Sequence, residues 1–125
     1  MFRNILWIGI GSGLGGIMRY LLSFWVQKET TSLFPIGTLL VNVLGCFIVG
    51  FLYGLFEKGN LLNPELRLFL TVGFCGGFTT FSTFVHENYT LFQSEHFFHF
   101  ALYAVVSFAL GLLAAYLGHA IVKLF

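Results

Sequence analysis

Phenylalanine and hydroxyl side chains follow one another closely in residues 73–84, which read GFCGGFTTFSTF. The aromatic side chains recur every three residues along one slowly drifting helix face, and they are Phe78, Phe81 and Phe84. A polar row runs beside them at spacings of three and four and comprises Thr80, Thr83 and Glu87. Phenylalanine ring edges carry partial positive charge, and hydroxyl groups donate hydrogen bonds. The two rows together could contact a small anion and replace part of its water shell.

The same stretch predicts an interrupted helix. Gly76 and Gly77 each lower helix propensity by about 1 kcal/mol relative to alanine, and the neighbouring hydroxyls can bond to the backbone instead. A break inside a membrane leaves amides and carbonyls without partners, which is tolerated only where the backbone is buried in protein or lines a wet cavity. The stretch therefore indicates a binding or permeation site within a span.

The composition indicates an integral membrane protein. Of the 125 residues, 58% are hydrophobic and 9% are charged, and the mean hydropathy is +0.90. Since a helix crossing the hydrocarbon takes about 20 apolar residues, we expect one all-α domain of four transmembrane helices, the third broken at mid-membrane. The expected spans are residues 4–26, which stay uncleaved, and residues 35–56, 66–92 and 97–123. The net charge of +1 gives no argument for a nucleic-acid partner.

Polar side chains also lie inside the second and fourth expected spans. Thr38 and Asn42 are four residues apart, so they lie a turn apart on one helix face. Asn42 either bonds to a neighbouring helix, an interaction worth about 1 kcal/mol in membrane proteins, or lines a polar path. Tyr103 lies about two turns into the fourth span, which is deep for an interface anchor, and Ser107 follows it at a spacing of four.

Two charged residues inside spans leave alternatives open. Arg19 lies a little past the middle of the first span, where a charge is costly unless it meets water, a partner or an anion. Its side chain either snorkels to the surface or draws an anion into a vestibule. Glu87 is either a functional intramembrane acid or a carboxylate near the interface that is solvated by water.

Glycines and cysteines in the spans are interpreted as packing residues. Gly11, Gly13 and Gly16 match the spacing of a dinucleotide-binding fingerprint, but that motif needs a preceding strand and a βαβ unit. Small residues in apolar spans instead allow membrane helices to approach closely. Cys46 and Cys75 fall inside apolar segments and are expected to act as small hydrophobes.

The basic residues outside the membrane indicate an orientation. One side of the expected topology carries Arg3, Lys58, Arg67 and Lys123, and the other carries Lys28. The positive-inside rule then places both termini in the cytoplasm. We expect a multi-pass protein of the inner or plasma membrane, surrounded by lipid.

Three stretches together resemble the CrcB/Fluc fluoride channels. They are GLGGIMRY at residues 13–20, GTLLVNVLGCFIVG at residues 37–50, and the motif at residues 73–84 with Glu87 after it. The resemblance covers the whole chain in length, span count and motif order. It implies a fluoride-selective channel rather than an enzyme, which exports toxic cytoplasmic fluoride by passive electrodiffusion. It also implies a dual-topology antiparallel dimer with two pores.

The resemblance implies roles for individual residues in the anion path. Asn42 would orient or contact the ion beside the pore phenylalanines, Phe81 and Phe84. Polar residues further along the path would be Thr38, Ser82, Thr83 and Glu87, with Tyr103 in the wall of the pore or vestibule.

Two further roles follow from the resemblance. Arg19 would match the family arginine at the wide aqueous entrance, or vestibule. The broken helix would contribute backbone carbonyls of Gly76 and Thr79 to a structural Na+ at the dimer interface. Two such breaks meeting at a dimer axis would supply four oxygen ligands, which suits a hard cation.

The partner chain in the dimer and the class of protein can each be interpreted in more than one way. Dual topology needs a weak charge bias, whereas the basic residues divide four to one. The expected partner is a second copy of the chain, and the alternative is an oppositely oriented homologous chain. A proton-coupled exporter of four spans would need an intramembrane acid, usually in the first span, where this chain has none. A non-transporting scaffold would have no use for the polar rows, and no serine or cysteine has an evident histidine base within a span.

Overall fold

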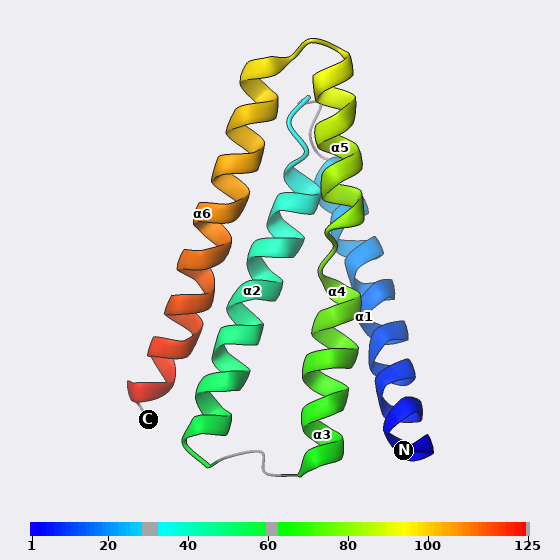
Figure 1. Ribbon diagram of the computed structural model, residues 1–125, viewed down its shortest axis with the longest axis vertical. Coiled ribbons are helices and arrows are strands. Elements are labelled where there is room, and N and C mark those ends of the chain that lie inside the picture. The colour runs from blue at the N-terminus through cyan, green and yellow to red at the C-terminus, as the bar shows by residue number, and fades with distance from the viewer. Residues whose placement is uncertain (29–32, 60–62, 125) are drawn as a thin grey trace.

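Four helical spans form the described part of the molecule, and all are long and apolar enough to cross a membrane. The computed structural model describes residues 1–28, 33–59 and 63–124, and in these residues it contains helices and no strand. The first two spans are α1 (Phe2–Lys28) and α2 (Ile36–Glu57). The fourth is α6 (Phe97–Ile121), which the short η2 (Val122–Leu124) extends. The predicted all-α, four-span membrane fold is therefore confirmed (Figure 1).

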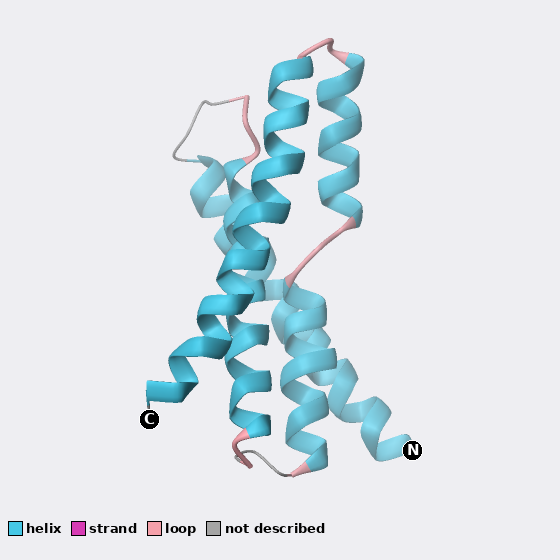
Figure 2. Ribbon diagram, turned by 60° about the vertical axis from the view of Figure 1, so that its left-hand side comes forward, coloured by secondary structure: helices cyan, strands magenta, loops and turns pink. Residues whose placement is uncertain are grey.

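The third span is a chain of helical pieces rather than one regular helix. It runs through α3 (Pro64–Leu68), the π-helical η1 (Phe69–Cys75), α4 (Gly76–Phe78) and α5 (Ser82–Gln93). Residues 79–81 join α4 to α5 as a loop in the middle of the span, which Figure 2 shows in pink. Thr79 is extended, with φ −84° and ψ 159°. The predicted break is present.

The break begins after the glycine pair and not at it. Gly76 and Gly77 belong to the helical turn α4. Gly77 is required for close packing rather than for the break. A Cβ there would overlap the carbonyl of Ser12 on α1. The glycine therefore permits the contact between two helices, and the hydroxyl residues that follow it interrupt the span.

Glycines bring the helices together in two pairs, α1 with the third span and α2 with α6. Gly11 and Gly15 of α1 are buried, and a Cβ at either would overlap backbone of the third span. Gly50 and Gly118 bring α2 and α6 together in the same way. The packing interpretation is confirmed at Gly11, Gly15 and Gly50, whereas it is wrong at Gly13, where a Cβ would meet nothing within 4 Å in the described part of the chain. Among the core side chains, Val41 and Tyr103 are fully buried.

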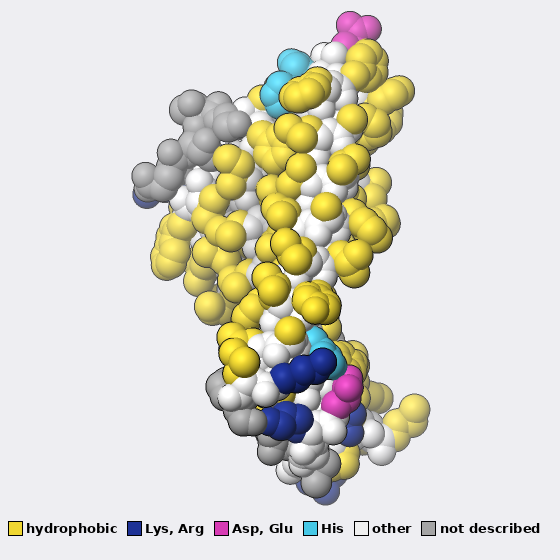
Figure 3. All heavy atoms as spheres, turned by 90° about the vertical axis from the view of Figure 1, so that its left-hand side faces the viewer, with side chains coloured by type: hydrophobic (Ala, Val, Ile, Leu, Met, Phe, Trp, Pro, Cys, Tyr) yellow, Lys and Arg dark blue, Asp and Glu magenta, His cyan; other side chains and the backbone are white. Residues whose placement is uncertain are grey.

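The start of α1, the end of α2, the start of α3 and the end of α6 lie at the same end of the molecule (Figure 1). Charged side chains gather at this end, and apolar side chains cover the face above them (Figure 3). We call it the basic end, because its described charged side chains are Arg3, Glu57, Lys58, Glu65, Arg67 and Lys123. This distribution is typical of helices that cross a bilayer and end at its surface.

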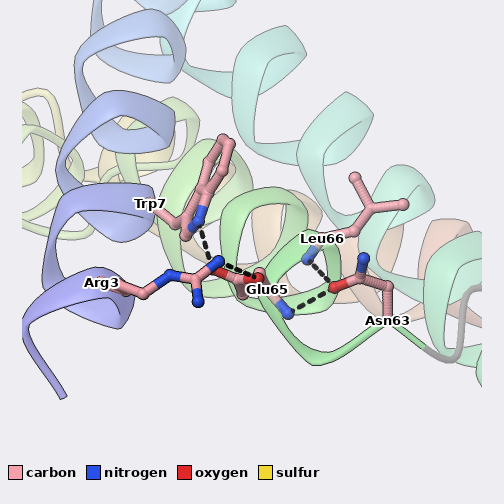
Figure 4. A network of polar contacts seen from close by, with 5 residues as sticks. All are labelled: Arg3, Trp7, Asn63, Glu65 and Leu66. Atoms are coloured by element: carbon pink, nitrogen blue, oxygen red, sulfur yellow. Dashed lines mark hydrogen bonds and ion pairs between the residues drawn. The ribbon is translucent and has the colours of Figure 1, made fainter.

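A polar cluster at the basic end fastens α1 to α3 (Figure 4). The Asn63 side chain caps α3 by accepting from the amides of Glu65 and Leu66, and Pro64 stands at the first helical position. The Glu65 carboxylate then accepts from Arg3 at 3.1 Å and from the indole of Trp7 at 2.6 Å. The start of the third span is thereby held against the start of the first.

Candidate functional site

The Asn42 side chain supplies the hydrogen bonds that the helical break removes. Its Nδ2 donates to the Thr80 carbonyl at 2.9 Å, and its Oδ1 accepts from the Thr80 amide at 2.8 Å. An unpaired buried backbone group costs about 1–3 kcal/mol, so one asparagine on α2 stabilises both polar groups of the interrupted residue. Of the two interpretations of Asn42, the bond to a neighbouring helix is present, and the same side chain also lines a groove described below.

The Arg19 side chain bonds to the helical turn α4, which precedes the break. Its Nε donates to the Gly77 carbonyl at 3.1 Å. In a continuous helix that carbonyl would accept from the Phe81 amide, so the arginine takes the place of a missing donor. A cation near a helix C-terminus is also favoured by the helix dipole. The guanidinium therefore has a partner at mid-span and does not snorkel away from it.

Two carbonyls at the break lose their usual donors. In a continuous helix the Thr80 amide would donate to the Gly76 carbonyl, and the Thr83 amide would donate to Thr79. The first amide donates to Asn42 instead, and the second donates to the Thr80 hydroxyl at 3.2 Å. The oxygens of Gly76 and Thr79 are thus released from helical bonding, at the residues where the resemblance implies a cation.

The Glu87 carboxylate is held by hydroxyl donors from two other helices. Thr38 Oγ1 donates to its Oε2 at 2.9 Å, and the Tyr103 hydroxyl donates to its Oε1 at 2.8 Å. Thr38 is 4% exposed and Tyr103 is 0% exposed. Glu87 itself is half-buried, and the two bonds hold its carboxylate between α2, α5 and α6.

An open groove of about 570 Å³ runs beside the break, and we call it the Phe81 groove. The groove is lined by Asn42, Cys46, Val49, Thr79, Thr80, Phe81, Phe84, Ala104, Ser107, Phe108 and Ala115. The Phe81 ring is 77% exposed, and its centroid lies 6.0 Å from that of Phe84. Phe84 in turn packs on Tyr103 at 5.0 Å. The aromatic row therefore forms one wall of the groove.

A second hollow, of about 300 Å³, lies between α1, α2 and the break, and we call it the Arg19 hollow. The lining residues are Arg19, Tyr20, Ser23, Phe24, Gln27, Thr38, Val41, Thr80 and Thr83. A neighbouring hollow is lined by Glu87, Thr90 and Leu91 of α5 and by Leu33 and Pro35, which precede α2. Ser23 and Gln27 line both hollows. Polar side chains thus continue from the break toward the end of the molecule opposite the basic end.

The predicted site residues gather around the break, although they do not share one cavity. Asn42, Phe81, Phe84 and Thr79 line the Phe81 groove. Arg19, Thr38 and Thr83 line the Arg19 hollow. Tyr103 supports the groove from the protein interior, and Glu87 lines the neighbouring hollow. Ser82 and Gly76 are exposed on the surface of the third span.

Ser107 is a groove residue that the sequence prediction did not assign to the path. Its hydroxyl oxygen is buried without a hydrogen-bond partner in the described part of the chain. The signal for it was the spacing of four from Tyr103, which places both side chains on one face of α6. The groove thus contains one more hydroxyl than the motif in the third span supplies.

These features define the chain as a multi-pass membrane protein with an interrupted span, beside which lie an aromatic-lined groove and a hollow lined by polar side chains. The model of the CrcB-like proteins, described as Camphor Resistance (CrcB), matches residues 6–119. The chain therefore belongs to the CrcB family.

Curated relatives cover nearly the whole chain. A protein of Azobacteroides pseudotrichonymphae genomovar. CFP2 is 40% identical over 125 residues, which is 100% of both chains. One of Flavobacterium psychrophilum is 40% identical over 121 residues, covering 97% of this chain and 98% of the relative. One of Bacteroides fragilis (strain YCH46) is 44% identical over 119 residues, 93% of each chain. Each of these relatives is named a fluoride-specific ion channel FluC, which confirms the prediction of a non-enzymatic class.

We predict that replacing Asn42 by leucine lowers the unfolding midpoint of the purified protein. The Asn42→Leu change removes both partners of the Thr80 backbone, and each unpaired group costs about 1–3 kcal/mol. Asn88→Leu is the matched control, because in the residues described Asn88 Oδ1 is buried without a partner and its Nδ2 donates to the Phe84 carbonyl of the same helix rather than to the break. Thermal unfolding in detergent measures both variants. Equal midpoints for the two would show that Asn42 does not support the break.

Proposed function

We propose that this chain forms a fluoride-selective channel. The observation that carries the proposal is the Phe81 groove, in which exposed phenylalanine rings and the Asn42 side chain meet at a mid-span break. The names of the curated relatives support fluoride as the ion. A non-transporting scaffold and an exporter of organic cations explain the chain less well. Neither class accounts for the family membership or for the rows of aromatic and hydroxyl side chains.

The groove has three features that favour a small anion. Helix α5 begins beside it at mid-span, and a helix N-terminus carries partial positive charge. The ring edges of Phe81 and Phe84 carry partial positive charge as well. Thr80 and Ser107, which both line the groove, supply hydroxyl donors. These groups replace hydration without a full positive charge, so a bound anion can also leave.

The polar residues beyond the groove have two distinct tasks in this proposal. Arg19 raises the local concentration of anions in its hollow, while its bond to Gly77 keeps the charge from moving into the path. The two carboxylate oxygens of Glu87 accept hydrogen bonds from the hydroxyls of Thr38 and Tyr103. This bonding fixes the wall of the path, because the three side chains come from different helices.

The proposed working form is an antiparallel, dual-topology dimer with two pores. A single chain leaves the Phe81 groove open along one side, and Phe81 itself is 77% exposed. An anion in that groove would meet lipid, which offers it no hydrogen-bond donor. A second copy with the opposite orientation would close each groove with its own side chains. The alternative partner is an oppositely oriented homologous chain.

The proposed dimer also contains a structural Na+ at its axis. The carbonyls of Gly76 and Thr79 suit this ion, because both have lost their usual helical donors to Asn42 and Thr80. Gly76 is exposed, and a Cβ there would approach only the Thr71 carbonyl, at 3.9 Å. A second copy can therefore come close to it. Two copies would offer four carbonyl oxygens to a hard cation, which would hold the two breaks together.

Transport in this proposal is passive. Fluoride accumulates in the cytoplasm when hydrogen fluoride enters the cell and dissociates there, and an open selective path returns the anion outward down its electrochemical gradient. The ion carries its charge across the membrane potential, which contributes about 2.3 kcal/mol per 100 mV.

We predict that the purified protein in liposomes carries fluoride electrogenically and strongly excludes chloride. Phe81→Ile and Phe84→Ile keep apolar bulk but remove the positive ring edge, and each is expected to lower fluoride efflux at least tenfold. Phe98→Ile is the control, because Phe98 is 74% exposed and lies in the first turn of α6, away from the groove. A fluoride electrode measures the efflux. Chloride efflux as fast as fluoride efflux would overturn the selectivity.

We predict that a single cysteine at Ser94 is labelled from both sides of the membrane. Ser94 is exposed in the connection between α5 and α6, and Cys46 and Cys75 are first replaced by alanine. An impermeant maleimide is added to intact cells and to inverted vesicles. A dual-topology homodimer gives about half labelling in each preparation, since its two copies have opposite orientations. Labelling confined to one preparation contradicts the homodimer and favours the heteromeric alternative.

We predict that exchanging Na+ for N-methylglucamine lowers both the unfolding midpoint and the dimer fraction, because the organic cation is too large for a carbonyl site. Size-exclusion chromatography and thermal unfolding at equal ionic strength measure the two effects. Returning Na+ should restore both quantities. A midpoint and a dimer fraction that do not depend on the cation would remove the sodium site from the proposal, while leaving the fluoride measurement unaffected.

A further inference from the structure

A groove of about 310 Å³ lies at the basic end, between the last turns of α2 and the start of the third span. We call it the Arg67 groove, and its lining is Tyr53, Phe56, Pro64, Arg67, Leu68, Thr71 and Val72. It is separate from the Phe81 groove and the Arg19 hollow, with which it has no lining residue in common.

Arg67 presents a positioned charge in this groove. Its guanidinium carbon lies 4.4 Å from the centroid of the Phe56 ring, and the Phe56 ring meets Tyr53 edge to face at 5.4 Å. The cation–π contact orients the guanidinium without neutralising it. The Thr71 hydroxyl donates to the Arg67 carbonyl at 2.6 Å, which fixes the backbone of the same turn.

The nearby carboxylates are engaged elsewhere. Glu65 accepts from Arg3 and Trp7 (Figure 4), and Glu57 pairs with His119 at 2.8 Å. In the part of the chain that the structure describes, Arg67 takes part in no ion pair. An arginine fork of this kind matches the oxygens of a phosphate.

The depth of the groove matches the boundary between headgroups and acyl chains. Tyr53 lies four residues before the end of α2, about 6 Å along the helix. Val72 lies five residues beyond Arg67, about one helical turn deeper in the membrane, and it is exposed. The headgroup layer on each side of a bilayer is about 5–7 Å thick. The groove thus offers a charge at headgroup level and an apolar wall below it.

We propose that the Arg67 groove binds one anionic phospholipid. The guanidinium of Arg67 and the hydroxyl of Tyr53 contact the phosphate, and an acyl chain lies along Leu68 and Val72. Charge complementarity favours this occupant over a zwitterionic lipid. The described residues of this end include four Lys and Arg side chains but two carboxylates, so its net charge is positive. The site goes beyond the proposed transport function and does not depend on it.

The test titrates the purified protein in detergent with dioleoyl phosphatidylglycerol, with the matching phosphatidylcholine, and with inorganic phosphate, while its unfolding midpoint is measured. Phosphatidylglycerol is expected to raise the midpoint, and the two other additions are expected to do so much less. Arg67→Gln should weaken the apparent affinity for phosphatidylglycerol about fivefold. Arg3→Gln is the matched control, since it removes the same charge at the same end but outside the groove.

A second variant, Phe56→Leu, keeps the arginine but removes the ring that orients it. An affinity for phosphatidylglycerol below that of the wild type supports the site even if Arg67→Gln folds poorly. Equal effects of the two lipids, or an equal loss of affinity in Arg3→Gln, overturn the proposal. A midpoint rise with inorganic phosphate alone would also overturn it, by showing an anion site without a lipid. Dissociation of the dimer in Arg67→Gln, with no headgroup preference in the wild type, would assign the groove to a second copy instead.

Discussion

The structure depends on the hydrogen-bonding needs of a backbone that is interrupted inside a membrane. Residues 79–81 leave the helix in the middle of the third span, where neither water nor lipid can satisfy their amides and carbonyls. Asn42 bonds both backbone groups of Thr80, and Arg19 bonds the carbonyl of Gly77. These two side chains come from different spans, so the break requires α1, α2 and the third span to be assembled together.

Glycine contacts make that assembly possible. Gly15 and Gly77 allow α1 and the third span to approach with backbone in contact, which brings Arg19 within reach of the break. Gly50 and Gly118 do the same for α2 and α6, and α2 carries Asn42. Hydrocarbon gives membrane helices little hydrophobic driving force to associate, so close packing of this kind contributes most of the attraction. The positions of the polar groups therefore follow from the positions of the glycines.

The division of hydrogen bonds at the break also separates two kinds of charge. In the proposed channel, the carbonyls of Gly76 and Thr79, which have lost their usual helical donors, would suit a cation, whereas the start of α5 and the ring edges of Phe81 and Phe84 would suit an anion. One interruption would thus place groups of opposite polarity a few residues apart. The basic end adds a third electrostatic feature at the membrane surface, because it carries Arg3, Lys58, Arg67 and Lys123 whereas the other end carries Lys28.

The sequence alone determined the class of fold, because the apolar length of each span and the charge of each loop are local properties that a bilayer reads directly. It also identified the third span as broken and Asn42, Arg19 and Glu87 as residues needing partners. Only the tertiary structure shows which groups form hydrogen bonds with these three side chains. The break lies after Gly77, and that glycine packs on Ser12 of α1 within a helical turn. The Glu87 carboxylate accepts hydrogen bonds from Thr38 and Tyr103. Spacing shows which residues share a helix face, but the partner across that face depends on how separate helices pack.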